Sequence, residues 1–342
     1  MGKREDVSKK PPSTLRRWLY RSRLINFLPI DRKKQFYLLT VFLVGVILFG
    51  LLNWRKSDAS SESVTAGKSD RDRATKLPAL RTGNTRLFYN RVPKCGSSTL
   101  VALLKKLAER NGFQHHSSPK LDDWGMFIKE QREDFVKEFN DEPPRTSFDR
   151  HLFFLDFAEF REKNPIYINL IRDPTERFIS EFYFRRRLQN EGVKKGERKW
   201  YDEDLENCVR TGKDYDCRLI DGTFIKNMIA FFCGHDIECS KHNSPNALSR
   251  AKQNVEKHFA VVGILEDLDM SLQVLEQTLP AYFAGAVDLY ASNPDHVVNK
   301  GKNRVDRVSE EVKQIIRANL TAEYDFYDFV RKRLIAQSQG KL

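Results

Sequence analysis

The stretch LFYNRVPKCGSSTLVALLKKLAER, residues 87–110, predicts a strand, a tight loop and a helix in direct succession. Residues 87–92, LFYNRV, predict a strand, and leucines recur at helical spacing from Thr99 to Arg110. Gly96 and three hydroxyl side chains stand where the loop opens into the helix. Because N–H groups at a helix start attract anions, the segment predicts either an anion-binding loop or an ordinary capped helix.

Two further apolar runs are each followed by a helix pattern. Residues 166–171 read IYINLI and lead into a helix that opens with Pro174, and residues 259–264 read FAVVGI and precede a helix predicted over 270–282. Such alternation predicts a single α/β domain with a central parallel sheet flanked by helices.

The rest of the domain is harder to assign. Residues 185–222 are charged and irregular, and we interpret them as a long loop. Residues 309–334 predict a long amphipathic helix with a break near Asn319.

The net charge of the 342 residues is +12, and it is unevenly placed. Eleven basic and three acidic side chains in residues 1–54 account for +8, which leaves +4 for the other residues. Residues 36–52 read FYLLTVFLVGVILFGLL, without a charge, and both flanks are basic. This pattern favours a transmembrane helix over a cleaved signal peptide or a buried helix, with the N-terminus in the cytosol.

The sequence therefore predicts a single-pass, type II membrane protein without a nucleic-acid role. Its parts are a cytosolic basic tail (1–35), a transmembrane signal anchor (36–54), a flexible luminal stem (55–84) and a folded domain (85–342).

Five cysteines fit an oxidising lumen. The most economical pairing joins Cys208 to Cys217 and Cys233 to Cys239, and it leaves Cys95 free. Zinc binding is the competing interpretation, but the sequence contains no C-x-x-C. Asn319 opens a glycosylation sequon inside a helical pattern.

A second candidate anion site follows the strand at 166–171. Arg172 stands at its carboxyl end, where open parallel sheets bind ligands, and Ser180 lies about two helical turns further on. With the loop at Lys94–Thr99, these residues describe a pocket for a nucleotide with two anionic groups. The alternative is that Arg172 only pairs with a neighbouring carboxylate.

The loop is not a Walker A motif, because Lys94 precedes the glycine, and this disfavours a P-loop kinase.

These residues carry a family resemblance. YNRVPKCGSST (89–99) and PIYINLIRDPTERFISEFYF (165–184) resemble the two nucleotide-binding segments of Golgi carbohydrate sulfotransferases. More narrowly, the chain resembles the uronosyl 2-O-sulfotransferases, which act on heparan sulfate or on dermatan and chondroitin sulfate. The segments that match are RHLFFLDFAEF (150–160), FFCGHDIEC (231–239), FAVVGILEDLDMSLQVLE (259–276) and LTAEYDFYDFV (320–330), and the resemblance runs from about residue 86 to about 335.

The resemblance implies a nucleoside-kinase-like sulfotransferase domain with a P-loop-like donor site. The donor it implies is 3′-phosphoadenosine 5′-phosphosulfate, with no metal. The loop around the 5′-phosphosulfate would be Lys94, Cys95, Gly96, Ser97, Ser98 and Thr99. Arg172 and Ser180 match the 3′-phosphate ligands, and Lys300, Lys302 and Arg304 are the counterpart of a basic loop that closes over the donor.

His151 matches the catalytic base of the family. In the heparan enzymes a second histidine stands two residues earlier, whereas here that residue is Asp149, so a two-histidine mechanism is not transferred. Lys94 is placed to stabilise the bridging oxygen as charge develops on it. Arg91 and Arg185 are the best candidates to bind the acceptor. Further candidates for a basic groove are Arg186, Arg187, Lys194, Lys195, Arg198 and Lys199.

The function expected from this resemblance is 2-O-sulfation of uronic acid in the glycosaminoglycan chains of proteoglycans, in the Golgi. The pair Arg150-His151 and the Cys95-Gly96-Ser97 loop favour the dermatan/chondroitin type. The alternatives are a heparan sulfate 2-O-sulfotransferase and a membrane-anchored polyanion-binding protein without catalysis. Relatives are often oligomeric, so a homo-oligomer stays open.

Overall fold

A computed structural model describes residues 86–118, 126–190, 204–212, 217, 227–292 and 308–342. All of them belong to one compact unit, Arg73–Leu342. The expected tail, anchor and stem (1–84) lie outside the described residues, as do Lys300, Lys302 and Arg304. Within the described ranges no helix is long and apolar enough to cross a membrane.

The centre of the domain is a five-stranded sheet in which every pair of neighbouring strands is parallel. Its spatial order is β2 (Gln114–Ser117), β3 (Thr146–Arg150), β1 (Leu87–Asn90), β4 (Ile166–Ile171) and β5 (Phe259–Ile264). This confirms the predicted α/β architecture with a parallel sheet. The three apolar runs are β1, β4 and β5, whereas β2 and β3 are additional strands.

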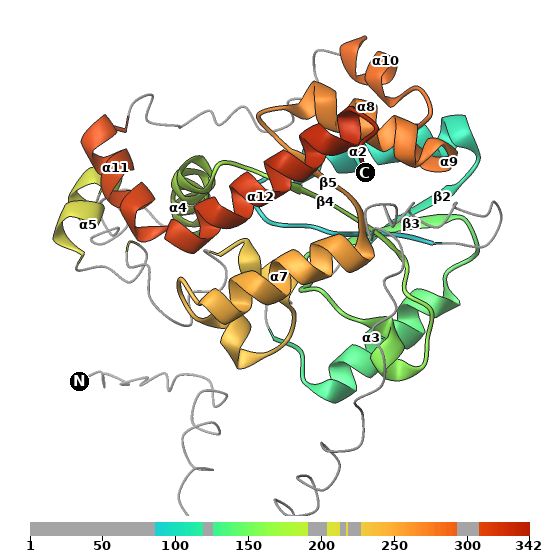
Figure 1. The fold of residues 1–342 in the computed structure, drawn as a ribbon, viewed down its shortest axis with the longest axis horizontal. Coiled ribbons are helices and arrows are strands. Elements are labelled where there is room, and N and C mark those ends of the chain that lie inside the picture. The colour runs from blue at the N-terminus through green and yellow to red at the C-terminus, as the bar shows by residue number, and fades with distance from the viewer. Residues whose placement is uncertain (1–85, 119–125, 191–203, 213–216, 218–226, 293–307) are drawn as a thin grey trace, which may run out of the picture. The chain divides into compact units, whose positions relative to one another are not determined.

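Helices lie on both faces of the sheet (Figure 1). The described helices are α2 (Ser97–Asn111), α3 (Lys129–Asp141), α4 (Pro174–Asn190), α5 (Leu205–Thr211), α6 (Ile229–Cys233), α7 (Pro245–His258), α8 (Leu268–Thr278), α9 (Pro280–Phe283), α10 (Ala286–Ala291), α11 (Glu310–Asn319) and α12 (Thr321–Ser338). Two short 3₁₀ helices join them, η2 (Phe157–Phe160) and η5 (Ile237–Ser240). The C-terminal helix breaks at Leu320, as predicted.

Phe88 of β1 lies at the centre of the core, with no exposed surface. Its ring centroid lies 5.4 Å from those of Phe135 and Phe139 on α3, 5.9 Å from that of Phe148 on β3, and 5.4 Å from that of Tyr167 on β4. Burying aromatic rings of this size is a main source of stability. The cluster ties α3 to three strands, so their carboxyl ends are held in a fixed relation.

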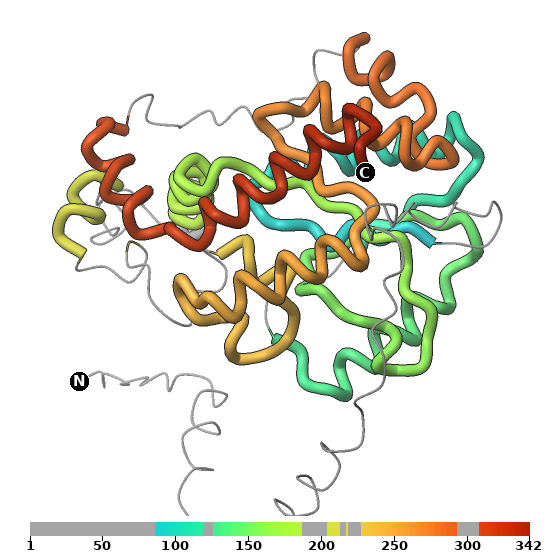
Figure 2. Tube along the Cα trace, in the orientation of Figure 1, coloured from blue at the N-terminus to red at the C-terminus, as the bar shows by residue number. Residues whose placement is uncertain are grey.

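The prediction of a loop over 185–222 is wrong in part. Helix α4 continues through Asn190, and α5 is a second helix within that range. Arg185 Nε lies 2.9 Å from Glu181 Oε1, and the Arg186 guanidinium lies 4.2 Å from the ring centroid of Phe182. These contacts, one helical turn apart, stabilise the helix despite its charged sequence. Helices α4, α5 and α11 lie together in the ribbon and the tube (Figure 2).

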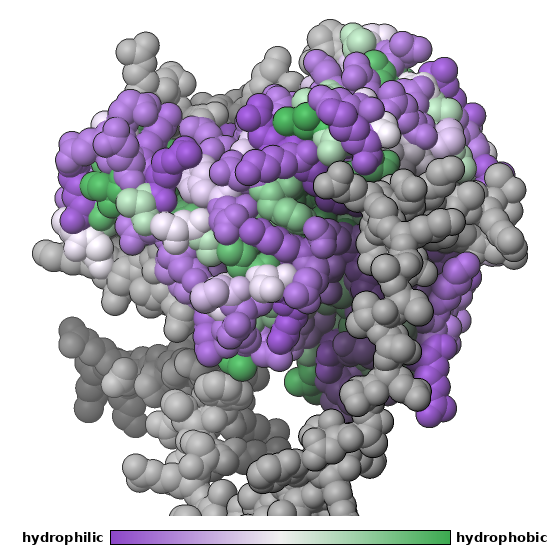
Figure 3. Space-filling view, viewed as in Figure 1, coloured by the Kyte–Doolittle hydropathy of each residue, from purple (hydrophilic) through white to green (hydrophobic). Residues whose placement is uncertain are grey.

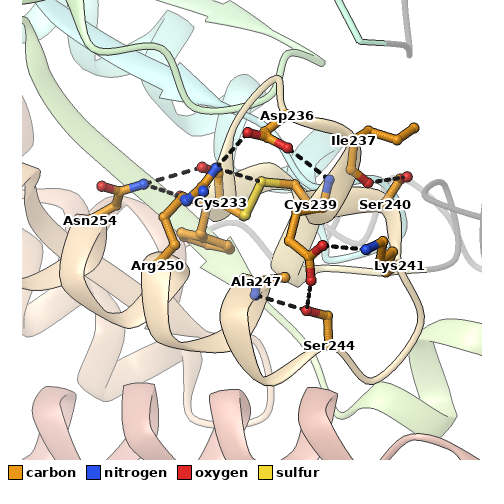
Figure 4. The surroundings of a disulfide bond; sticks show 12 residues. Cys233, Asp236, Ile237, Cys239, Ser240, Lys241, Ser244, Ala247, Arg250 and Asn254 are labelled. Carbon is orange, nitrogen blue, oxygen red and sulfur yellow. Dashed lines mark hydrogen bonds and ion pairs between the residues drawn. A yellow bond between two sulfur atoms is a disulfide. The ribbon is translucent and has the colours of Figure 1, made fainter. Parts of the chain in front are cut away.

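Both predicted disulfides are present, with Cα–Cα distances of 5.8 Å for Cys208–Cys217 and 5.5 Å for Cys233–Cys239. The second joins α6 to η5, and Figure 4 shows Arg250 of α7 beside it. Arg250 Nη1 lies 3.8 Å from Cys239 Sγ and 3.3 Å from Asp236 Oδ2. The bridge therefore connects three elements into one packed corner. The visible face of the domain is mostly hydrophilic, with scattered hydrophobic residues (Figure 3).

Candidate active site

Three neighbouring strands end at one edge of the sheet, and the predicted site follows them. The loop at 91–96 follows β1, His151 follows β3 and Arg172 follows β4. The chain leaves β1 toward β2 on one side of the sheet, and β4 toward β5 on the other. Ligands bind at such a reversal of strand order, so the topology brings these segments to the expected position.

The loop after β1 turns sharply twice. Lys94 and Gly96 both have left-handed backbone conformations, with φ of 65° and 74°. A Cβ on Gly96 would lie 2.6 Å from Leu265 Cδ1, so only glycine fits without a shift. Helix α2 begins at Ser97, directly after this turn. The Thr99 N–H donates to the Gly96 carbonyl at 3.0 Å, and the N–H groups of this first turn, together with the helix dipole, favour an anion.

Two basic side chains adjoin this loop. The Lys94 ammonium lies 3.9 Å from the ring centroid of Phe184 on α4. Arg172 Nη1 donates to the Lys94 carbonyl at 3.5 Å, and the same side chain lies 3.5 Å from Glu176 Oε2 and 3.9 Å from Glu266 Oε1. Arg172 thus makes the predicted carboxylate contact and also touches the loop. The structure brings the two predicted anion sites together.

His151 is held by the main chain of the same loop. Its Nδ1 lies 3.0 Å from the carbonyl oxygen of Arg91, and since a carbonyl only accepts, Nδ1 carries the proton. The neutral ring then keeps a lone pair on Nε2. Burial and the positive charge of Arg91 lower the pKa of His151 to about 4, and Lys94 contributes in the same direction. The ring is therefore neutral at neutral pH, which is the form that can take up a proton.

Cys95 is fully buried, and its thiol donates to the Pro93 carbonyl at 3.6 Å. Burial raises the pKa of this thiol to about 12, so it stays protonated and is no nucleophile. Its free state agrees with the predicted cysteine pairing. Beneath it Arg177 of α4, almost fully buried, donates to Pro93 at 3.4 Å.

The remaining predicted residues differ in position. Ser97 is buried, while Ser98, Thr99 and Ser180 are half-buried. The predicted acceptor ligands Arg91 and Arg185 are both paired within the protein, with Asp149 at 2.9 Å and Glu181 at 2.9 Å respectively. Asn319 is exposed at the end of α11. Lys194, Lys195, Arg198 and Lys199 lie outside the described residues.

Sequence reasoning missed several groups of this edge. Phe184, Arg177 and Glu266 each contact the loop or Arg172, yet they occur in patterns typical of ordinary helices and strand ends. The sequence points to Asp149 only because it stands where the heparan enzymes have a histidine, and nothing in the sequence indicates that His115 belongs to this edge. The alternating strand TSFDR (146–150) was the signal that could have placed Asp149 in a sheet. Among the described residues no cluster of His, Cys, Asp or Glu could hold a metal ion.

Comparison with known proteins adds the family context. Residues 78–330 match the family described as "Sulfotransferase family". The Drosophila melanogaster protein named "Uronyl 2-sulfotransferase homolog pip" is 34% identical over 279 residues, covering 75% of this chain and 54% of the relative. "Uronyl 2-sulfotransferase" of Homo sapiens is 33% identical over 261 residues, covering 73% of this chain and 62% of the relative.

A second group of relatives carries a different substrate in its name. "Heparan sulfate 2-O-sulfotransferase 1" of Xenopus laevis is 32% identical over 278 residues, covering 75% of this chain and 74% of the relative. The match of this chain therefore spans 54% and 62% of the two uronyl-type relatives and about three quarters of the heparan-type relative.

Proposed function

The chain belongs to the sulfotransferase family, and from that premise we propose that it transfers a sulfuryl group from 3′-phosphoadenosine 5′-phosphosulfate to the 2-hydroxyl of uronic acid residues in glycosaminoglycans. One observation carries the proposal. His151, with Nδ1 bound to the Arg91 carbonyl and Nε2 able to accept a proton, stands at the same sheet edge as the Lys94 loop. A base and an anion loop are the two parts that this transfer requires.

The roles follow from the chemistry. A new bond forms between the sugar oxygen and sulfur while the bond from sulfur to the phosphate oxygen breaks, and adenosine 3′,5′-bisphosphate leaves with that electron pair. His151 takes the hydroxyl proton on Nε2. Lys94 stabilises the negative charge that develops on the departing oxygen. The residues at 94–99 hold the 5′ end, and Arg172 and Ser180 hold the 3′-phosphate.

We propose dermatan or chondroitin sulfate as the favoured polymer, and heparan sulfate as the alternative. The uronyl-type relatives are 33% and 34% identical, and the heparan-type relative is 32% identical, so identity alone separates them weakly. Asp149 stands where the heparan enzymes have a second histidine, and this difference favours the dermatan/chondroitin type. Basic residues such as Arg185 would line the acceptor groove, and Lys300, Lys302 and Arg304 would cover the donor.

The proposed location is the Golgi lumen, with residues 36–54 as the membrane anchor. Two disulfides support an oxidising compartment, since such bonds are rare in the cytosol. Asn319 lies exposed at a helix end, which is compatible with a glycan.

Replacing the base tests the assignment. We expect His151→Ala to abolish transfer and to leave binding of adenosine 3′,5′-bisphosphate unchanged, because the side chain acts on the acceptor hydroxyl. Turnover is followed with sulfur-labelled donor, and product binding by calorimetry. His116→Ala is the matched control, since that histidine is half-exposed and pairs with Glu142. Turnover retained by His151→Ala would refute its role as the base.

A further inference from the structure

Asp149 has no exposed surface and stands two residues before His151. Its Oδ1 lies 2.9 Å from Arg91 Nε, and its Oδ2 lies 3.2 Å from His115 Nε2 and accepts from Ser117 Oγ at 2.6 Å. A buried carboxylate costs free energy unless it is paired and hydrogen-bonded. Here Oδ2 has both of its contacts from β2, whereas Oδ1 forms an ion pair with Arg91 that lacks the alignment of a hydrogen bond.

His115 connects two residues of β3. Its Nδ1 lies 2.6 Å from Ser147 Oγ, and its Nε2 faces Asp149, so the ring lies along the strand between two side chains of one face. The strand register places His115 beside Ser147 and Ser117 beside Asp149. The histidine side chain is only 3% exposed. The cluster of His115, Ser117, Ser147 and Asp149, called the β2–β3 cluster below, is therefore rigidly packed.

Arg91 links this cluster to the base. Its guanidinium pairs with Asp149, its N–H donates to the Arg150 carbonyl at 2.8 Å, and its own carbonyl accepts from His151 Nδ1 at 3.0 Å. Three consecutive residues, 149–151, thus hold Arg91 at its side chain, its N–H and its carbonyl. The same residue thus contacts the buried carboxylate with its side chain and His151 with its carbonyl.

We propose that Asp149 and His115 are positioning residues, which hold Arg91 so that its carbonyl keeps the proton of His151 on Nδ1 and the lone pair on Nε2. This inference rests on the proposed function for its kinetic part only. It also gives Arg91 a different role from acceptor binding, because its guanidinium is engaged inside the protein. The Asp149 carboxylate thus acts on His151 through Arg91. It stands where the heparan enzymes have a second histidine.

The electrostatics agree with an ionised carboxylate. Burial alone would raise the pKa of Asp149, but hydrogen bonds from His115 and Ser117 and the charge of Arg91 outweigh it, and the pKa of Asp149 lies below its usual value. The negative charge of Asp149 pairs with Arg91, and on its own it raises the pKa of His151, against the larger effects of burial and of Arg91.

Asp149→Asn is the direct test. An asparagine would keep one oxygen for Ser117 and His115 but would turn an N–H₂ group toward Arg91, so the guanidinium would be released. We expect kcat to fall about tenfold or more, as part of the 10²–10⁴-fold that a positioned base contributes, with the dissociation constant of adenosine 3′,5′-bisphosphate unchanged. Asp156→Asn is the matched control, because that carboxylate binds Ala158, Asn164 and His258 instead.

Substitutions of Arg91 separate the two roles for this residue. Arg91→Lys keeps a cation for Asp149, so most of kcat should be retained. Arg91→Ala removes that cation and leaves only His115 and Ser117 on the carboxylate, and it should lower kcat as Asp149→Asn does. An acceptor ligand would behave differently, since Arg91→Ala would then raise KM for the polymer and leave kcat intact. That pattern would overturn the proposal.

A readout without turnover keeps this inference independent of the proposed function. In the full chain with ¹⁵N-labelled histidine rings, the His151 resonances are identified with His151→Gln, and they should show a proton on Nδ1. Asp149→Asn should produce a mixture of the two tautomers, and Ser117→Ala, a milder change, a smaller shift in the same direction. An unchanged Nδ1–H tautomer in a folded Asp149→Asn protein would contradict the proposal, even if no acceptor were found.

Discussion

The role of His151 is decided by one main-chain contact. By its sequence alone, a histidine followed by Leu152, Phe153 and Phe154 suits a core position as well as a site. The hydrogen bond to the Arg91 carbonyl assigns the proton to Nδ1, and burial together with the charge of Arg91 keeps the ring neutral. The residue is therefore held in the form that the proposed base requires.

The pH dependence of kcat/KM follows from this environment. The pKa of His151 is lowered to about 4 by burial and by Arg91, so the base is neutral well below the ordinary histidine value of about 6.5. We expect kcat/KM to stay level as pH falls from 7 to about 5.5, and to decline only near pH 4. A half-maximal point near pH 6.5 would contradict the assigned environment.

The same shift affects stability, which the activity measurement has to control for. The pKa of His151 is lower in the folded than in the unfolded protein, where it is near 6.5. Its contribution to the free energy of unfolding is therefore fully present above pH 6.5 and is lost as the pH falls toward 4. Circular dichroism on the same samples separates loss of the base from loss of the fold.

Individual residues were predictable where one motif contained them. Lys94, Gly96 and Arg172 followed directly from strand ends and helix starts, and the structure brings them to one edge. Asp149 and His115 were not, because their significance arises from pairing between two short strands. Which side chains face each other across strands depends on register, and register is set by the whole sheet.

At the level of elements, the joint between β1 and α2 is the part of the site with the least freedom. Gly96 has a φ of 74°, and a Cβ there would lie 2.6 Å from Leu265 Cδ1. We expect Gly96→Ala to weaken binding of adenosine 3′,5′-bisphosphate about tenfold or more, because the displaced loop no longer presents its N–H groups to the anion. Calorimetric titration measures the effect.

Gly112, at the other end of the same helix, provides the control. Its φ of 66° is nearly the same, but a Cβ there would meet nothing within 4 Å. Gly112→Ala should lower the free energy of unfolding through backbone strain, on the order of 1–2 kcal/mol. Binding of adenosine 3′,5′-bisphosphate should stay intact. The double variant Gly96→Ala, Leu265→Ala should regain part of the affinity. If Gly96→Ala and Gly112→Ala lost the same affinity for adenosine 3′,5′-bisphosphate, contact with Leu265 would not be the cause.

Strands and helices with a clear hydrophobic pattern could be predicted from the sequence, and those without one could not. The apolar runs at 166–171 and 259–264 coincide with β4 and β5, because fully buried parallel strands read as continuous apolar stretches. Strand β2 reads QHHS and is not buried as a whole, so no such run marks it. Helix α4 extends beyond its apolar part through contacts one turn apart, which a charged sequence conceals.

For the whole molecule, the net charge of +12 divides into two parts with different uses. Residues 1–54 carry +8, which suits the cytosolic side of a membrane anchor, and the remaining chain carries +4. Many cations of the described domain are paired internally, as Arg91 and Arg185 are. Recognition of the proposed polyanionic acceptor would therefore rest on local arrangement more than on bulk charge.

The most direct test of the central proposal uses the full chain, solubilised in detergent, with sulfur-labelled 3′-phosphoadenosine 5′-phosphosulfate and a panel of heparan, dermatan and chondroitin acceptors. Disaccharide analysis of the products identifies the labelled position. We predict label in 2-O-sulfated uronic acid, with dermatan or chondroitin ahead of heparan. A folded protein that binds adenosine 3′,5′-bisphosphate but labels none of these polymers at that position would contradict the proposed function.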